Sequence, residues 1–180
     1  MNRRHLTLAA PLVLAMALGA CGRSGNKADQ LASSYCPNPF VVEDAQSLTR
    51  FKPGPGRDPR DIAFQANLTG TGVACSARAG KLEIELKVRI AVSAGPAVTP
   101  GTNSVPYFVR VLNGSGGVTQ GQDFNADFRL SPANPRGASV EEITLTLFYN
   151  QPSDLGTFRV AVGLKPTPEE LEYNRRAAAR

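Results

Sequence analysis

Alternating hydrophobic and polar positions are the main signal in this sequence. The clearest stretch runs from 81 to 92, where every second residue is aliphatic and nearly all the residues between are charged. The aliphatic positions are Leu82, Ile84, Leu86, Val88, Ile90 and Val92. A strand would place all six on one face, whereas a helix would spread them around its surface. The stretch therefore predicts a half-buried strand that forms one wall of a hydrophobic core.

The same alternation recurs along the chain and predicts about seven or eight strands. Further strands are expected near 40–42, 62–69, 73–75, 107–111, 124–130, 143–149 and 158–164, with turns at 70–72 and at Asn113-Gly114. The connections leave little room for the helical crossovers that parallel strands need. We therefore expect an all-β, antiparallel two-sheet sandwich of the immunoglobulin or fibronectin kind. A small barrel or a jelly roll is the alternative.

The last part of the chain changes period and predicts a short helix from about 168 to 176. Thr167 occupies the N-cap position, Pro168 the first helical position and Glu170 the third. This is the pattern of a capping box, in which two side chains satisfy free amide groups reciprocally. Leu171 is the residue expected to dock this helix on the sandwich.

The N-terminal segment has the features of an export signal. Arg3 and Arg4 precede an uncharged, mostly apolar run over 6–20. That run is shorter than the roughly 20 residues of a membrane-spanning helix, and it ends in small residues. We therefore expect residues 1–20 to be a signal peptide that is removed.

The end of this signal, Leu18-Gly19-Ala20-Cys21, resembles the lipobox of bacterial lipoproteins. In that family the cysteine receives a diacylglycerol, the signal is cut before it, and the new amino terminus is usually acylated. The resemblance implies lipidation of Cys21, with membrane lipid as a partner, and a place in the bacterial envelope facing the periplasm. Gly22, where an Asp would retain the protein in the inner membrane, implies the outer membrane. An ordinary secretory signal with a stray cysteine, or a buried N-terminal helix, is the alternative.

The expected organisation therefore has three parts. Residues 1–20 are the lipoprotein signal peptide, 21–34 are the lipidated cysteine with a flexible polar linker, and 35–180 are a single β-sandwich domain. The stretches 48–51, 105–109, 162–164 and 167–171 resemble a group of alphaproteobacterial lipoproteins without an assigned activity. That resemblance carries no catalytic residues.

Two cysteines remain after lipidation, Cys36 and Cys75. An oxidising compartment favours a disulfide between them, closing a separation of 39 residues (75 − 36). Two free thiols are the alternative.

Composition excludes several classes of function. Removal of 1–20 takes away His5, the only histidine, and leaves 18 basic residues (20 − 2) against 15 acidic ones. A net charge of about +3 does not indicate nucleic-acid binding. Without histidine, neither a Ser-His-Asp triad nor a histidine zinc site can form. We expect no enzyme activity, no metal and no cofactor.

Carboxylates offer the remaining chemistry. Glu141-Glu142, or Asp123 with Asp127, are candidates for a glycosidase pair, and Asp44, Asp58 and Asp61 for calcium ligands. The spacing of each set favours a solvated surface instead. The most charged short segment, 57–61, is a candidate contact for a partner or an anionic glycan. The aromatic pairs at 107–108 and 148–149 place one ring on each face of a strand, so one ring of each pair is a candidate exposed patch.

These observations favour a lipid-anchored, non-catalytic interaction or scaffold domain. Its partner would be an envelope protein or peptidoglycan. A carrier for a small apolar ligand, a glycan-binding protein and a carboxylate-dependent glycan hydrolase are the alternatives.

Lipidation makes a direct prediction. Cys21→Ser removes the acyl acceptor, and two or three acyl chains are what stable anchoring requires. We expect the variant to leave the membrane fraction and to lose incorporation of labelled palmitate. Membrane retention of Cys21→Ser at the wild-type level would contradict the lipobox assignment.

Overall fold

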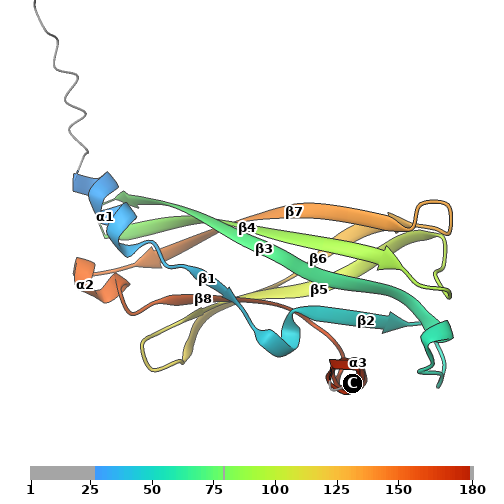
Figure 1. Ribbon diagram of the computed structural model, residues 1–180. Helices are drawn as coiled ribbons and strands as arrows, with labels where there is room; N and C mark the ends of the chain where they lie inside the picture. The colour runs from blue at the N-terminus through green and yellow to red at the C-terminus, as the bar shows by residue number, and fades with distance from the viewer. Residues whose placement is uncertain (1–26, 79, 179–180) are drawn as a thin grey trace, which may run out of the picture.

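The computed structural model describes residues 27–78 and 80–178, and within them eight strands form two sheets (Figure 1). The β4 sheet has the order β2 (Ser47–Phe51), β3 (Ile62–Arg78), β4 (Lys81–Ala94), β7 (Arg136–Phe148). The β5 sheet has the order β1 (Pro39–Val41), β8 (Arg159–Leu164), β5 (Gly101–Leu112), β6 (Val118–Leu130). The helices are α1 (Lys27–Tyr35), α2 (Pro152–Leu155) and α3 (Pro168–Ala178), with 3₁₀ turns η1 (Glu43–Ala45) and η2 (Pro59–Asp61). The predicted all-β, two-sheet sandwich is confirmed.

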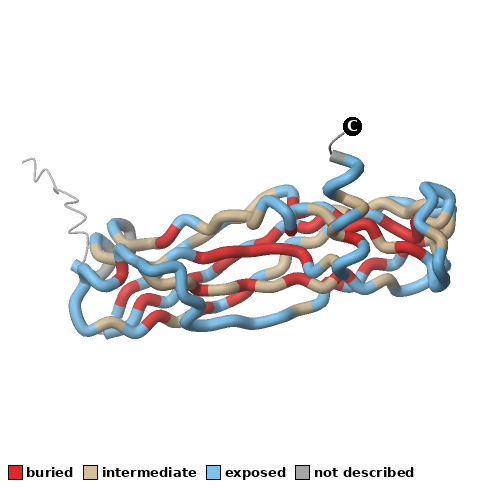
Figure 2. Tube along the Cα trace, turned by 90° about the horizontal axis from the view of Figure 1, so that it is seen from below, coloured by how far each residue is buried: buried red, intermediate tan, exposed pale blue. Residues whose placement is uncertain are grey.

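The core lies between the sheets, and buried positions alternate with exposed ones along the strands (Figure 2). β4 forms the largest wall of this core. The six aliphatic residues of β4 are 0 to 5% exposed, and the charged residues between them face solvent. Alternate residues of β5, β6 and β7 pack against them. At about 0.8 kcal/mol per buried methylene, this wall is the strongest local drive to fold.

The strand order resembles that of an immunoglobulin-like sandwich, with β2 added beside the first strand, no strand of the described residues in the D position, and an exchange at the edge of the β5 sheet. β3, β4 and β7 take the positions of strands A, B and E, and β6, β5 and β8 those of C′, C and F. Beside F, where that fold has its last strand, lies β1 from the start of the domain. β1 runs parallel to β8, with Pro39 opposite Val160 and Val41 opposite Val162. The N-terminal segment thus closes the edge of the β5 sheet, and the C-terminal segment forms α3.

The expected flexible linker over 21–34 is wrong from Lys27 onward, because α1 occupies that stretch. Leu31 and Tyr35 pack against the core, and Ala32 is buried in it. These three side chains lie within one turn of a helix, so folding covers an apolar face that the overall polarity of the stretch conceals. The signal peptide and Cys21 lie outside the described residues.

Two expected turns also differ. The turn at 70–72 is wrong: β3 continues through it with a bulge between Leu68 and Gly70, and Val73 and Cys75 keep their pairing with β4. The β5–β6 hairpin is confirmed, but its loop spans 113–117. Gly116, not Gly114, has the positive φ, at 82°. The Asn113 carboxamide oxygen accepts the amides of Ser115 and Gly117, which stabilises this longer loop.

The expected disulfide joins Cys36 to Cys75, with 5.7 Å between the Cα atoms. Cys36 directly follows α1, and Cys75 lies in β3 near the end of the strand. The bridge therefore fixes α1 and β1 to the β4 sheet at one end of the sandwich.

The capping box of α3 is confirmed. The Thr167 amide donates to Glu170 Oε2 at 2.8 Å, and the Glu170 amide donates to Thr167 Oγ1 at 3.3 Å. Leu171 is half-buried, and two contacts of the helix with β2 are made two and three residues later. The Tyr173 ring packs edge-on against Phe51 at 4.9 Å, and Asn174 Nδ2 donates to the Ser47 carbonyl.

Removing the disulfide makes a prediction on stability. In the chain-entropy account, closing 39 residues lowers the entropy of the unfolded chain and is worth about 4 kcal/mol. Urea unfolding of Cys36→Ser/Cys75→Ser should show a loss of that order. Val118→Ala, at a residue 60% exposed, is the control and should change the free energy of unfolding by less than about 0.5 kcal/mol. A double variant as stable as the wild type would contradict the structural role of the bridge.

Candidate functional site

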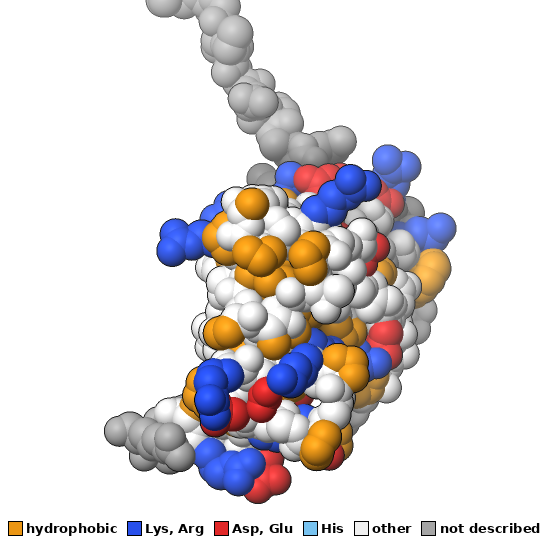
Figure 3. Space-filling model, turned by 90° about the vertical axis from the view of Figure 1, so that its right-hand side faces the viewer, with side chains coloured by type: hydrophobic (Ala, Val, Ile, Leu, Met, Phe, Trp, Pro, Cys, Tyr) orange, Lys and Arg blue, Asp and Glu red, His pale blue; other side chains and the backbone are white. Residues whose placement is uncertain are grey.

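The two ends of the sandwich differ in what they expose. At the α1 end lie α1, α2, the β3–β4 turn and the β5–β6 loop; at the loop end lie the segments 52–61, 95–100 and 131–135 (Figure 1). Backbone bonds tie the loop-end segments together, since the Ala94 amide donates to the Pro135 carbonyl and the Gly95 amide to the Ala63 carbonyl. Figure 3 views the loop end, where basic and acidic side chains intermingle beside apolar ones.

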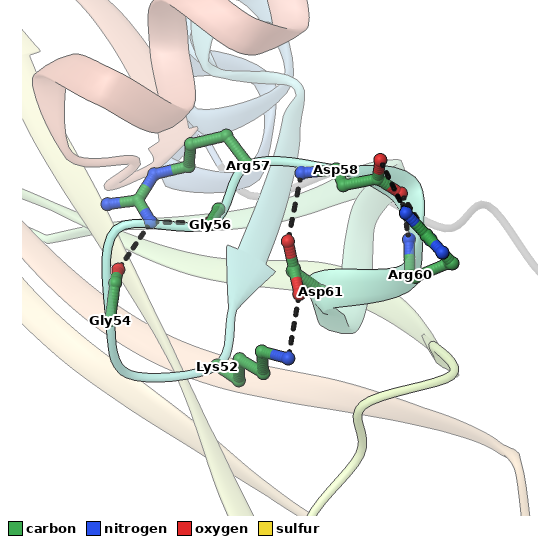
Figure 4. A network of polar contacts seen from close by, with 7 residues as sticks. All are labelled: Lys52, Gly54, Gly56, Arg57, Asp58, Arg60 and Asp61. Atoms are coloured by element: carbon green, nitrogen blue, oxygen red, sulfur yellow. Dashed lines mark hydrogen bonds and ion pairs between the residues drawn. The ribbon is translucent and has the colours of Figure 1, made fainter.

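The segment 52–61 is a charged loop held together by its own hydrogen bonds and ion pairs (Figure 4). Asp58 caps η2 by accepting the Arg60 amide, and the Asp58 amide donates to Asp61 Oδ2 at 3.1 Å. Lys52 Nζ lies 2.7 Å from Asp61 Oδ1, so one carboxylate holds both sides of the loop. Gly56 permits this packing, because a Cβ there would stand 2.3 Å from Asp61 Oδ2.

Arg57 connects this loop to α3. Its guanidinium donates to the Gly54 and Gly56 carbonyls at 2.9 and 2.7 Å and pairs with Glu169. It also lies over the Phe51 ring, 5.2 Å from the centroid. The loop is therefore held against the first turn of α3 by one side chain.

Glu170 is the buried charge of this region. Its side chain is 5% exposed, and Oε1 lies 3.1 Å from Arg50 Nε while Oε2 accepts the Thr167 amide. A buried carboxylate is tolerated when it is paired and hydrogen-bonded in this way. Arg50 and Glu170 thus fix α3 to the end of β2.

Between these elements lies a hollow of about 480 Å³, lined by the end of β2, the following loop and the first turn of α3. Three cations line or flank it, Arg50, Lys52 and Arg57, and each is paired with a carboxylate. Paired cations offer hydrogen bonds without a net positive field. The hollow therefore suits a neutral or mixed-charge polar surface, such as a peptide or a glycan, better than a phosphate.

A second hollow and an open strand edge lie at the same end. The hollow has about 300 Å³ and is lined by the start of β5, the end of β6 and the turn after it. β8 pairs only with residues 107–112 of β5, and the Lys165 amide donates to the Pro106 carbonyl as the chain leaves the sheet. By the period of a strand, the backbone groups of Thr102 and Ser104 point the same way as that carbonyl. Both residues are exposed, and no strand among the described residues pairs with them on that side.

Five of the carboxylates proposed for catalysis or calcium, Asp44, Asp58, Asp61, Asp123 and Glu142, are each paired with a cation, whereas Asp127 and Glu141 take part in none of the ion pairs of the described residues. Hydrogen bonds from Lys165 and then Arg110 lower the pKa of Asp123, and one from Lys87 lowers the pKa of Glu142. A glycosidase acid needs a raised pKa, so these shifts have the opposite sign. Arg175 pairs with Asp44, apart from the loop that holds Asp58 and Asp61, and the described residues contain no metal-ligand cluster of His, Cys, Asp and Glu.

The two aromatic pairs differ in how far their rings are exposed. Tyr107 is buried, and burial, with a smaller effect of Glu141, raises its pKa to about 12. The Phe108 ring lies so close to Gly163 that a Cβ there would be 2.4 Å from Cζ, so Phe108 covers β8. Phe148, by contrast, is 67% exposed. It stands at the α1 end, away from the hollows.

Sequence reasoning singled out 57–61 and missed the rest of this region. The pairs Arg50–Glu170 and Arg57–Glu169 join residues more than 110 positions apart, and no local pattern encodes them. The capping box that places Glu170 at the third position of α3 was the available signal.

Comparison of the chain with protein-family models, with curated proteins and with solved structures finds no match. Across 27–78 and 80–178, no helix has both the length and the apolar character needed to cross a membrane.

The loop network predicts a pH-dependent order. Hydrogen bonds from Lys52 and then from the Asp58 amide lower the pKa of Asp61 below its ordinary value near 4. The contribution of this carboxylate is therefore complete above about pH 4 and is lost as the pH falls through the lowered pKa. By ¹⁵N relaxation, the wild-type loop should gain mobility between pH 7 and pH 2, whereas Asp61→Ala should be mobile at both.

Glu142→Gln, which breaks an exposed pair with Lys87 elsewhere on the β4 sheet, is the control and should leave the loop ordered at pH 7. A loop in Asp61→Ala as rigid as the wild type would show that Asp61 does not hold it.

Proposed function

We propose that this chain is a lipid-anchored lipoprotein of the bacterial envelope, whose sandwich is a non-catalytic interaction domain facing the periplasm. The anchor is Cys21, and the loop end engages an envelope protein or peptidoglycan. The observation that carries the proposal is the separation of the two ends. The chain enters the domain at the α1 end, where the disulfide pins it, while the hollows and the open edge of β5 lie at the loop end.

The length of the sandwich determines how far apart its two ends lie. β4 has 14 residues, which at about 3.3 Å each span about 46 Å. A domain held by its α1 end would display its loop end at that distance from the lipid. A partner that lies away from the membrane, such as the cell-wall polymer or a protein bound to it, would be within reach.

The alternatives receive less support. A carrier for an apolar ligand needs a cavity of several hundred Å³. The space between the sheets holds the side chains of the core cluster. A glycan hydrolase needs two cooperating carboxyl groups, and the candidate carboxylates Asp123 and Glu142 are each bound by cations of their own.

Site-specific photo-crosslinking in intact cells tests the proposal. A photoreactive residue at Thr102, on the open edge, or at Pro53, beside the larger hollow, should yield a dominant adduct with one envelope protein or with peptidoglycan fragments. The matched control is Thr144, exposed on the outer face of β7. Adducts as abundant from Thr144 as from Thr102, or none from either loop-end position, would contradict the assignment of the loop end.

A further inference from the structure

The α1 end carries an exposed aromatic ring among cations. Phe148 is the last residue of β7 and is 67% exposed, a large apolar area for a surface ring. Lys81, opposite it on β4, holds Nζ 5.4 Å from the ring centroid. Arg78, three residues before Lys81, is the last residue of β3, and its backbone carbonyl accepts a hydrogen bond from the Tyr149 hydroxyl. An aromatic ring beside basic side chains is the combination that membrane interfaces favour.

Other residues of the α1 end also suit a membrane interface. Lys27 is exposed at the start of α1, and Arg159, the first residue of β8, lies over the Phe40 ring at 4.5 Å. Val118, 60% exposed, is the first residue of β6. Asp154, in α2, is an acidic residue of this end, where its carboxylate accepts the Gln151 amide. Asp29, within α1, and Glu83, on β4, are two further acidic residues of this end, so it carries four cations (Lys27, Arg78, Lys81 and Arg159) and these three acids. Lys81 lies directly opposite Phe148, and Arg78 lies opposite Lys81 on the next strand, so the part of the surface around the ring is complementary to anionic headgroups.

The chain length between the anchor and the domain brings this end to the lipid. Cys21 and Lys27 are six residues apart, which limits their separation to about 21 Å. Lys27 is nine residues from Cys36, or about 13 Å along a helix. Cys36 is bonded to Cys75, and Cys75 is three residues, or about 10 Å, from Arg78 on the same strand.

We infer that the α1 end is a membrane-contacting surface, with Phe148, Lys81 and Arg78 resting on the anionic phospholipid headgroups of the leaflet that holds the acyl anchor. This inference rests on the proposed lipidation of Cys21 and adds an orientation to it. The acyl chains hold the protein at the membrane, and this surface keeps the sandwich upright with the loop end away from the lipid.

The chain has no tryptophan, so one substitution introduces a single fluorescent reporter. Phe148→Trp places it on the proposed surface. Val140→Trp is the matched control: it lies on the same strand and face, is 51% exposed and stands opposite a cation, Arg89, but is eight residues or about 26 Å away. Each mature, cell-derived protein is reconstituted into vesicles of phosphatidylethanolamine and phosphatidylglycerol that contain a headgroup-labelled quencher lipid.

Quenching of the indole fluorescence in Phe148→Trp, with none in Val140→Trp, is the expected result. Lys81→Gln/Arg78→Gln in the Phe148→Trp background should reduce the quenching, since each cation is worth roughly a fivefold change in affinity for an anionic surface. Equal quenching in both reporter variants would mean that the domain lies on its β4 sheet. Absence of quenching in both variants would mean that the domain stands free of the lipid. Both results overturn the inference.

Flotation of the same vesicles separates this inference from the proposed function. Protein that fails to float, with no acyl group on Cys21 by mass spectrometry, refutes the anchor. The surface is then tested in that same protein by adding anionic vesicles: salt-sensitive quenching in Phe148→Trp but not in Val140→Trp still supports it, and its absence overturns it.

Discussion

The attachment of the N-terminal segment to the sandwich is the constraint on which the rest depends. Two independent interactions hold it, the disulfide from Cys36 to Cys75 and the parallel pairing of β1 with β8. The first fixes where the chain enters the domain, and the second closes an edge that would otherwise expose unpaired backbone groups. Because the entry point is fixed, the α1 end of the sandwich lies next to the N-terminal segment, and the loop end lies at the opposite end of the domain.

The exchange at the edge of the β5 sheet also explains the C-terminal segment. Because β1 occupies the position beside β8, no later strand can pair with that edge of β8. The chain leaves the sheet at Lys165 and forms α3, which packs against the outside of β2. That departure leaves the first half of β5 without a neighbour on one side and places the first turn of α3 against the charged loop. The open edge and the larger hollow thus have one common origin in the topology.

The sequence allowed the fold class to be predicted because burial on one face of a strand imposes a period of two, as β4 shows along its whole length. The capping box of α3 was equally readable, since its two hydrogen bonds join residues three apart. The helix α1 was missed because its apolar face consists of only a few residues. That face can be recognised as buried only once the fold places β3 against it. The bulge at Leu68–Gly70 was read as a turn because glycines favour both, and pairing with a neighbouring strand decides between them. The loop-end site depends on contacts such as Arg50–Glu170, which only the tertiary fold creates.

The central claim is that the sandwich stands on the membrane by its α1 end. Neutron reflectometry of the acylated protein on a supported bilayer measures this directly, as the thickness of the protein layer. An upright domain predicts a layer of about 50 Å, since β4 alone spans about 46 Å and loops extend beyond it. A layer of about half that thickness would mean that the domain lies on a sheet face and would contradict the account.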